Sequence, residues 1–288
     1  MNHALRVPLP GRLRRLPRWR TLLVLIVAAL VVIGVLAGLR RGPAAPPATQ
    51  QHSTTAAQDN RTLLGVLEHV DPQVVAAVGA GGLENTLVQV KDAPALLGAS
   101  HHPQVVFLAT EGCGLCAAQR WSMVIALSRF GTIKDVLLAI SSVKEATGPL
   151  ATFSFRHLQY TSRYVDLIAV ETTDPNGHTL ATLSPGDQRV VDRYDAPPYV
   201  AESSRGAVPW LDVANRYVMS GSGYAAQVLQ NLNWTQIAGR LGNAQDPVTR
   251  AVVGNANWIT AAICRVTGMS PAAACNPPAI QQLAQRLG

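Results

Sequence analysis

Two cysteines separated by two residues are the feature of this 288-residue sequence that most directly suggests chemistry. Cys113 and Cys116 lie within residues 110–121, TEGCGLCAAQRW. A cysteine thiolate is a nucleophile, and two cysteines one helical turn apart can close a disulfide with each other. The spacing therefore predicts a redox-active pair that exchanges its disulfide with other thiols.

The elements expected around this pair place Cys113 at the start of a helix. The apolar run 104–109, QVVFLA, predicts a short buried strand that leads into the motif. After the motif, apolar or small residues recur at helical spacing: Ala117, Trp121, Val124, Ile125 and Ser128. Gly131 is expected to stop this helix. The free N–H groups and positive dipole end of a helix N-terminus stabilise a thiolate. Cys113 is therefore predicted to be acidic and reactive. Trp121, on the same helix, is expected to belong to the core.

The net charge of +7 is concentrated at the N-terminus. Residues 1–41 contain eight arginines and no acidic residue, while the 16 basic and 17 acidic residues of 42–288 leave a net charge of −1. A nucleic-acid-binding protein would carry its basic residues on the folded domain, so the high isoelectric point indicates membrane topology and not a nucleic-acid partner.

Residues 21–39, TLLVLIVAALVVIGVLAGL, contain no charge and are long enough to cross a membrane as one helix. Six arginines precede this segment and two follow it, so the positive-inside rule predicts a cytoplasmic basic tail over 1–20 and a signal anchor over 21–39. A cleaved signal peptide is the alternative. The sequence thus predicts a single-pass cell-membrane protein with its main domain outside the membrane.

A linker and one folded domain are expected after the anchor. Residues 40–60 are rich in Pro, Ala, Thr and Gln and predict a flexible tether, and 61–288 is expected to fold as the extracytoplasmic domain. Within it, 135–141 (DVLLAIS) predicts a second core strand, buried on both faces. Residues 142–207 are expected to be a mixed insertion, with a strand over 164–170 and a helix opened by Ser184-Pro185.

The last third of the chain is expected to contain a hairpin and then helices. Strands over 210–213 and 216–219 are joined by a turn at Ala214-Asn215. Helices over 234–241 and 247–266 follow, and they form a C-terminal helical extension. The sequence as a whole predicts an α/β fold.

Cys264 and Cys275 are expected to form a structural disulfide. Four cysteines facing an oxidising exterior divide into two pairs. A second redox pair is the alternative, although nothing near Cys264 resembles a helix N-terminus that presents a thiolate. A four-cysteine zinc site would need a second short-spaced pair, and ten residues separate Cys264 from Cys275.

Several stretches carry a family resemblance. A strand, Cys113-Gly-Leu-Cys116 and a helix, followed later by Val208-Pro209 before a hairpin, resemble the thioredoxin superfamily. AAQRWSMVIALSRFG, ATFSFRHLQYTSRYVDLIAVE, DVANRYVMSG and NANWITAAICRVTG are similar to a narrower family of membrane-anchored, thioredoxin-like proteins of unassigned function. The resemblance covers most of 61–288 and implies a thioredoxin-like fold with an insertion between core strands.

The resemblance also implies roles for individual residues. Cys113 matches the attacking cysteine, Cys116 the resolving cysteine, and Pro209 a cis-proline that faces the disulfide. A cis bond before Pro209 would let the Val208 backbone hydrogen-bond a client chain. Gly-Leu between the cysteines replaces the Gly-Pro of thioredoxins and the Pro-His of strong periplasmic oxidases, so the direction of electron flow stays open.

The resulting hypothesis is a membrane-anchored thiol–disulfide oxidoreductase acting on cysteine-containing client proteins. It needs no cofactor, but it needs a membrane-bound or diffusible redox partner. Glu111, two residues before Cys113, can move protons or raise the pKa of the thiol, and a solvated loop carboxylate is the alternative. Two other functions remain open: a non-catalytic peptide-binding module on the same scaffold, and a metal-binding thiol protein.

Overall fold

The computed structural model describes residues 60–142 and 144–288, and these residues belong to one compact unit of the chain. The expected basic tail, anchor and most of the linker lie outside them. Within the described residues, no helix is long and apolar enough to cross a membrane.

A five-stranded mixed sheet with the order β1-β9-β8-β2-β7 forms the centre of the domain. β2 lies parallel to β7 and antiparallel to β8, and β9 and β1 continue the sheet antiparallel. The strands are β1 (Val88–Gln89), β2 (Gln104–Ala109), β7 (Asp166–Glu171), β8 (Trp210–Val213) and β9 (Tyr217–Ser220). The chain is therefore α/β, as predicted.

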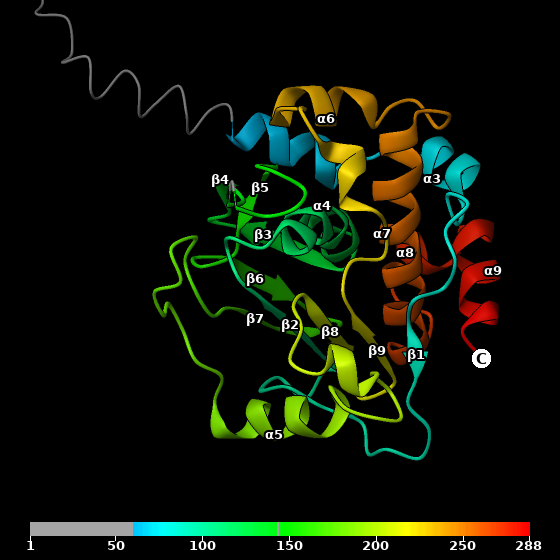
Figure 1. Ribbon diagram of the computed structural model, residues 1–288. Coiled ribbons are helices and arrows are strands. Elements are labelled where there is room, and N and C mark those ends of the chain that lie inside the picture. Colours follow the sequence, from blue (N-terminus) through cyan, green and yellow to red (C-terminus); the bar gives the residue numbers. More distant parts are fainter. Residues whose placement is uncertain (1–59, 143) are drawn as a thin grey trace, which may run out of the picture. The chain divides into compact units, whose positions relative to one another are not determined.

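Helices cover both faces of the sheet (Figure 1). Alternate residues of β2 divide between two cores: Val105 and Phe107 face the larger core under α4 and α7, and Val106 faces a smaller core under α5. The helices are 60–68, α3 (Pro72–Val78), α4 (Gly114–Ser128), α5 (Pro185–Tyr194), α6 (Trp234–Arg240), α7 (Pro247–Val266), α8 (Ala272–Cys275) and α9 (Pro278–Arg286), with short 3-10 turns at η1 (Glu202–Ser204) and η2 (Ala226–Leu229).

Local signals place most of these elements where the sequence predicted them. Ser184 caps α5 through a hydrogen bond from the Asp187 N–H, and Asp246 caps α7 in the same way through Val248. The hairpin β8–β9 turns at Ala214 and Asn215, both with positive φ. Trp121 is fully buried in the larger core and packs edge-on against Phe153, with ring centroids 4.7 Å apart.

The prediction of a second core strand at 135–141 was wrong. β4 (Leu137–Ile140) pairs only with β5 (Ala151–Ser154) in a separate two-stranded sheet, and Leu137 and Ile140 are 47% and 53% exposed. A four-residue apolar run has no period that separates a buried strand from an exposed one.

The strand beside β2 is instead β7, which lies inside the segment predicted to be an insertion. Its charged ends weaken its apolar signal, because Asp166 begins it and Glu171 ends it. The segment inserted between α4 and β7 contains two small two-stranded sheets. One is formed by β4 and β5, and the other by β3 (Gly131–Lys134) and β6 (Gln159–Ser162).

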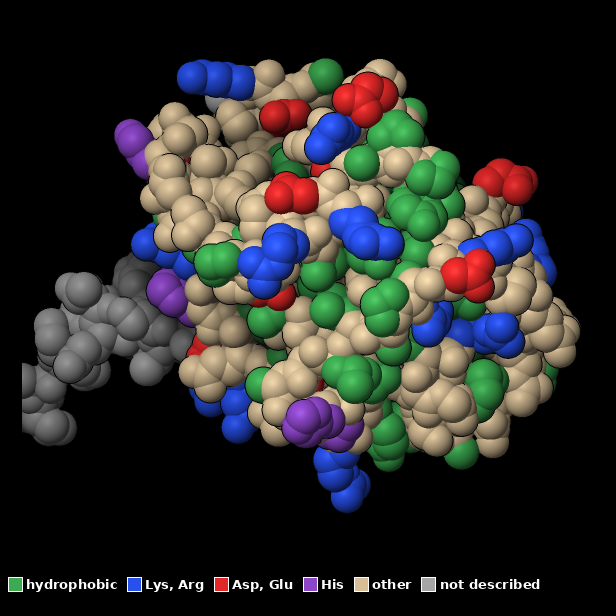
Figure 2. Space-filling model, turned by 90° about the horizontal axis from the view of Figure 1, so that it is seen from below, with side chains coloured by type: hydrophobic (Ala, Val, Ile, Leu, Met, Phe, Trp, Pro, Cys, Tyr) green, Lys and Arg blue, Asp and Glu red, His purple; other side chains and the backbone are tan. Residues whose placement is uncertain are grey.

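Charges of both signs are mixed over the surface of the domain. Figure 2 shows one face, on which Lys and Arg side chains lie among Asp and Glu side chains and hydrophobic ones. This distribution agrees with the near-neutral charge of 42–288.

Candidate active site

Cys113 occupies the N-cap of α4. Its Sγ accepts a hydrogen bond from the Cys116 N–H at 3.0 Å, and its carbonyl accepts from the Ala117 N–H at 2.9 Å. β2 ends at Ala109, and a short turn of four residues connects it to the helix. The sulfur therefore lies where the first amides of the helix can stabilise a thiolate.

The two cysteines of the motif form a disulfide with a Cα–Cα distance of 5.1 Å. They differ in accessibility, because Cys116 is fully buried whereas Cys113 is half-buried. Only Cys113 is open to another thiol while the domain stays folded.

Val208 and Pro209 lie beside Cys113, although 95 residues separate them in sequence. The Val208 carbonyl oxygen is 3.5 Å from Cys113 Sγ, and the Val208–Pro209 peptide bond is cis. Pro209 immediately precedes β8, and its carbonyl accepts from the Gly221 N–H at 2.8 Å, which holds this end of the hairpin. The pairing of β8 with β2 is what brings the proline to the cysteines.

Two loops pack against the glycines of the motif. The Gly112 carbonyl accepts from the Ser142 N–H at 2.9 Å, and a side chain at Gly112 would contact Pro175. A Cβ on Gly114 would overlap Thr147 Oγ1. The glycines on both sides of Cys113 therefore let neighbouring segments approach closely.

The Glu111 carboxylate accepts a hydrogen bond from Ser154 Oγ at 2.5 Å, and the Glu111 N–H donates to the Thr173 carbonyl at 3.0 Å. Within the described part of the chain, no hydrogen bond connects its carboxylate to either cysteine. Glu111 thus ties the cysteine turn to β5 and to the segment after β7, while its expected role in proton transfer stays a prediction.

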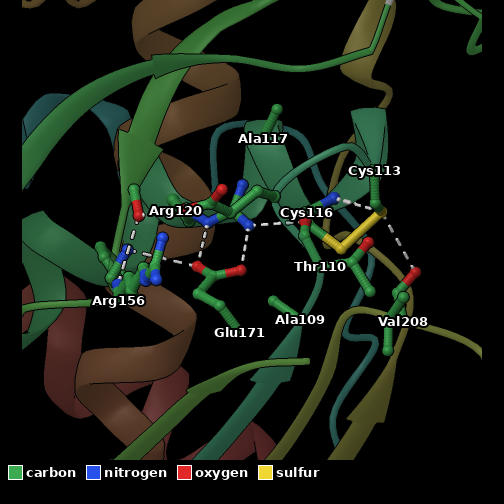
Figure 3. Close-up of polar contacts among 12 residues, drawn as sticks. Ala109, Thr110, Cys113, Cys116, Ala117, Arg120, Arg156, Glu171 and Val208 are labelled. Atoms are coloured by element: carbon green, nitrogen blue, oxygen red, sulfur yellow. Dashed lines mark hydrogen bonds and ion pairs between the residues drawn. A yellow bond between two sulfur atoms is a disulfide. The ribbon is translucent and has the colours of Figure 1, made fainter. Parts of the chain in front are cut away.

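A buried ion pair beneath the motif was not predicted from the sequence. Arg120, one turn after Cys116 on α4, donates to both oxygens of Glu171 at 2.8 and 2.6 Å and to the Thr110 carbonyl at 2.7 Å (Figure 3). The side chains of Arg120 and Glu171 are 0% and 1% exposed. The pair links α4, β7 and the start of the cysteine turn. The sequence offered one signal for this pair, an arginine on the expected buried face of a helix. It did not identify the partner, because Glu171 lies 51 residues away.

The structure joins Cys264 to Cys275, the pairing that the sequence predicted. Their Cα atoms are 5.6 Å apart, and both side chains are fully buried. Cys264 lies near the end of α7 and Cys275 ends α8, so this disulfide fastens the C-terminal helices to each other.

The described residues contain no group of three His, Cys, Asp or Glu side chains placed to hold a metal ion. His102, one of the two adjacent histidines before β2, lies 3.8 Å from Asp166.

Comparison with known proteins gives a family but no activity. Residues 88–265, more than half of the chain, match the family described as a domain of unknown function, DUF929. The matched segment contains the Cys113–Cys116 motif, Val208-Pro209 and the buried ion pair. No curated protein and no solved structure matches the chain. The chain belongs to the DUF929 family.

Proposed function

We propose that this chain is a thioredoxin-like thiol–disulfide oxidoreductase that acts on the cysteines of client proteins. One observation carries the proposal. The half-buried Cys113 is the N-cap of α4, is bonded to the buried Cys116, and lies 3.5 Å from the Val208 carbonyl. This arrangement combines an accessible sulfur, a helix terminus that favours its thiolate, a second sulfur within reach, and a backbone edge for a client chain.

The reaction proceeds in two exchanges. The Cys113 thiolate attacks a client disulfide: a Cys113–client S–S bond forms, the client S–S bond breaks, and the departing client thiolate takes a proton. Cys116 then loses its proton and attacks Cys113 Sγ, which closes the internal disulfide and releases the client as a dithiol. Two electrons pass to the client, and the reverse sequence oxidises it. A redox partner restores the starting state.

The arrangement of β2, α4, β7 and the β8–β9 hairpin supports a thioredoxin-like fold. β2, α4 and parallel β7 form a βαβ unit with the cysteines at its first turn, and the hairpin returns antiparallel to β2 with Pro209 at its start. Glu111 belongs to this turn, and Val208, from a distant part of the sequence, lies beside it. Both residues are candidates for client contact.

The proposal includes an anchor over residues 21–39 that holds the domain outside the membrane. The arginines that flank this apolar segment support the orientation. Cells that express the full chain with a C-terminal tag test it: external protease should remove the tag, and a tag that stays protected in intact cells would contradict this topology.

The reduction potential of the Cys113–Cys116 pair tests the chemistry. Purified 61–288 is equilibrated in glutathione buffers, and its free thiols are counted by alkylation. A value near about −120 mV makes the protein a disulfide donor, and one near about −270 mV makes it a reductase. Cys116→Ser should accumulate a mixed disulfide with a model client, whereas Cys113→Ser should not.

The second disulfide provides the matched control. A Cys264→Ser/Cys275→Ser variant should keep the potential of the first pair, because the two disulfides lie on different elements. A Cys113–Cys116 pair that does not cycle anywhere in this range would refute catalysis and leave a binding module on the same scaffold.

A further inference from the structure

β4 is an edge strand whose apolar side chains face solvent. Among the described strands it pairs only with β5, and the side chains of Leu137, Leu138 and Ile140 are exposed. β5, in contrast, is buried along its whole length. A sheet edge that combines free backbone groups with exposed apolar side chains is a place where another extended chain can add a strand.

The pairing with β5 shows which backbone groups of β4 are free. In an antiparallel pair, alternate residues direct both their N–H and their C=O at the partner strand. The Ser141 N–H donates to the Leu150 carbonyl at 3.0 Å, so Ala139, two residues earlier, also faces β5. The N–H and C=O groups of Leu138 and Ile140 therefore point away from β5. They make no hydrogen bond to the part of the chain that the structure describes.

Both ends of this free edge are already bound. By the same alternation, Val136 and Ser142 lie on it just before and just after the free groups. The Val136 carbonyl accepts from Asn60 Nδ2 at 2.6 Å, and the Ser142 N–H donates to the Gly112 carbonyl at 2.9 Å. Because Gly112 precedes Cys113, the row of free backbone groups ends at the cysteine turn.

A groove of about 910 Å³ accompanies β4. Apolar side chains of β4 and of the helix over 60–68 line it, and both elements lie in the same part of the domain in Figure 1. Its described lining contains two basic and two acidic residues: Arg61, Lys134, Glu68 and Asp135. These charges cancel, so the groove favours an uncharged, apolar occupant.

We propose that the β4 edge binds an extended apolar segment of the client protein as an added antiparallel strand, an inference that rests on the thiol–disulfide exchange proposed above. Alternating free N–H and C=O groups are complementary to another extended backbone, and the groove accommodates alternate side chains. A chain antiparallel to β4 runs away from the cysteine turn, so the client cysteine should precede this segment by about three residues. The tether is a poorer occupant, because residues 40–59 contain no Leu, Ile, Val, Met, Phe or Trp.

Reduction of three peptides by the reduced full chain in nanodiscs tests this proposal. Each peptide carries one cysteine bonded to glutathione, and it should leave as a thiol together with glutathione while the chain closes its own disulfide. In the apolar peptide, about six residues that alternate valine and threonine begin about three residues after the cysteine. The polar peptide has serine in place of valine, and the third is the apolar peptide with N-methylated amides.

The apolar peptide should be reduced at least about tenfold faster than the other two at limiting concentration, because it alone offers both the side chains and the N–H groups of an added strand. Equal rates for the three peptides would overturn the proposal, whichever of a second copy, the tether or lipid then covers the edge.

Serine in place of the peptide cysteine separates docking from exchange. This form of the apolar peptide should bind the chain at least about tenfold more tightly than the matching polar peptide, as measured by fluorescence anisotropy. Such binding, without reduction of any of the glutathione-linked peptides, would support the docking edge and refute the oxidoreductase. Reduction of all three at one rate would refute the docking edge and leave the oxidoreductase.

Variants of β4 locate the binding edge. Ile140→Pro removes one donor from the free edge and keeps the pairing with β5, because this N–H points away from β5. It should bring the rate for the apolar peptide close to that for the polar peptide. Leu97→Ser, at an exposed position outside the groove, is the control and should keep the preference.

A second variant decides if Ile140→Pro does not fold. Leu138→Lys/Ile140→Lys keeps the backbone and places two charges among the apolar side chains of the edge, which opposes strand addition. An unchanged preference for the apolar peptide in this variant would reject the β4 edge as the docking site.

Discussion

The cysteine turn is shaped by contacts that its glycines permit. Gly114 follows Cys113, and the space that its side chain would fill is occupied by Thr147 Oγ1. Thr147 itself is held in place because its carbonyl accepts from the Gln230 side chain at 2.6 Å. The first residue between the cysteines is therefore constrained by packing from a neighbouring loop, in addition to any effect that it has on the thiol.

Gly114→Ala should destabilise the oxidised domain by about 1–3 kcal/mol, because the added methyl group overlaps Thr147. Gly114→Ala/Thr147→Ala should recover most of this loss, because the clashing hydroxyl is gone and the remaining 3.3 Å contact with the Cβ of residue 147 needs a shift of only a few tenths of an ångström. Urea unfolding measures both variants.

Gly65→Ala, on the helix over 60–68 with no atom near its added methyl group, is the control and should not destabilise the domain. If the double variant is as unstable as Gly114→Ala alone, the contact with Thr147 is not the cause.

At the scale of the elements, the Arg120–Glu171 pair joins α4 to β7 under the cysteine turn. Neither side chain reaches solvent, and Arg120 also holds the Thr110 carbonyl at the end of β2. A buried ion pair costs free energy to desolvate, so this pair adds little net stability. Its larger effect is to fix the position of α4 relative to β7, because Arg120 must face Glu171.

Glu171→Gln and Arg120→Met should each cost about 3–5 kcal/mol of unfolding free energy, because each leaves one buried charge uncompensated. The double variant Arg120→Met/Glu171→Gln should lose clearly less than the sum of the two. A double-mutant cycle in urea gives the coupling.

The exposed pair Arg205–Glu202, 3.7 Å apart, is the matched control, and Glu202→Gln should change stability by less than about 1 kcal/mol. Additive losses at Arg120 and Glu171 would contradict the proposed interaction.

Elements with a local signal could be predicted from the sequence, and their neighbours in space could not. The strand 104–109, the cap at Ser184 and the hairpin turn at Ala214-Asn215 each depend on adjacent residues, and all were found in place. The positions of β4 and β7 depend on which strand pairs with β2, and four apolar residues in a row do not specify that.

Parts of the candidate site could likewise be predicted from adjacent residues, and other parts could not. The cysteine pair and its place at a helix start follow from residues 104–121, and the resemblance to thioredoxin-like proteins supplied Pro209. The loops at Thr147 and Pro175, and the partner of Arg120, come from contacts between distant parts of the chain.

At the scale of the whole domain, Asp212 is a buried acid that makes stability depend on pH. Asp212 lies in β8, on the face of the sheet under α5, and is fully buried. One of its oxygens accepts from the Asn215 N–H at 2.7 Å, and the other has no partner among the described residues. Burial raises the pKa of Asp212 to about 7.

The domain should therefore lose stability as the pH rises from about 4 to 7. In this range the folded state holds a proton on Asp212 that the unfolded chain has released, so raising the pH favours unfolding. The loss from this group should be about 1.4 kcal/mol per pH unit and should level off above the folded-state pKa.

Asp212→Asn should remove the part of this slope that Asp212 contributes, and Asp192→Asn, at an exposed position on α5, should keep the wild-type slope. Urea unfolding of the three proteins between pH 4 and 8 is the measurement. Parallel curves for the wild type and Asp212→Asn would show that Asp212 is ionised in the folded state.

A single helix, α4, begins at the cysteine pair and ends at Arg129. At that far end the Arg129 guanidinium donates to Asn257 and Thr260 on α7. α7 also carries Cys264, which the second disulfide joins to α8. The helix that presents the exchangeable disulfide is therefore fastened, at its other end, to the helix that the permanent one secures.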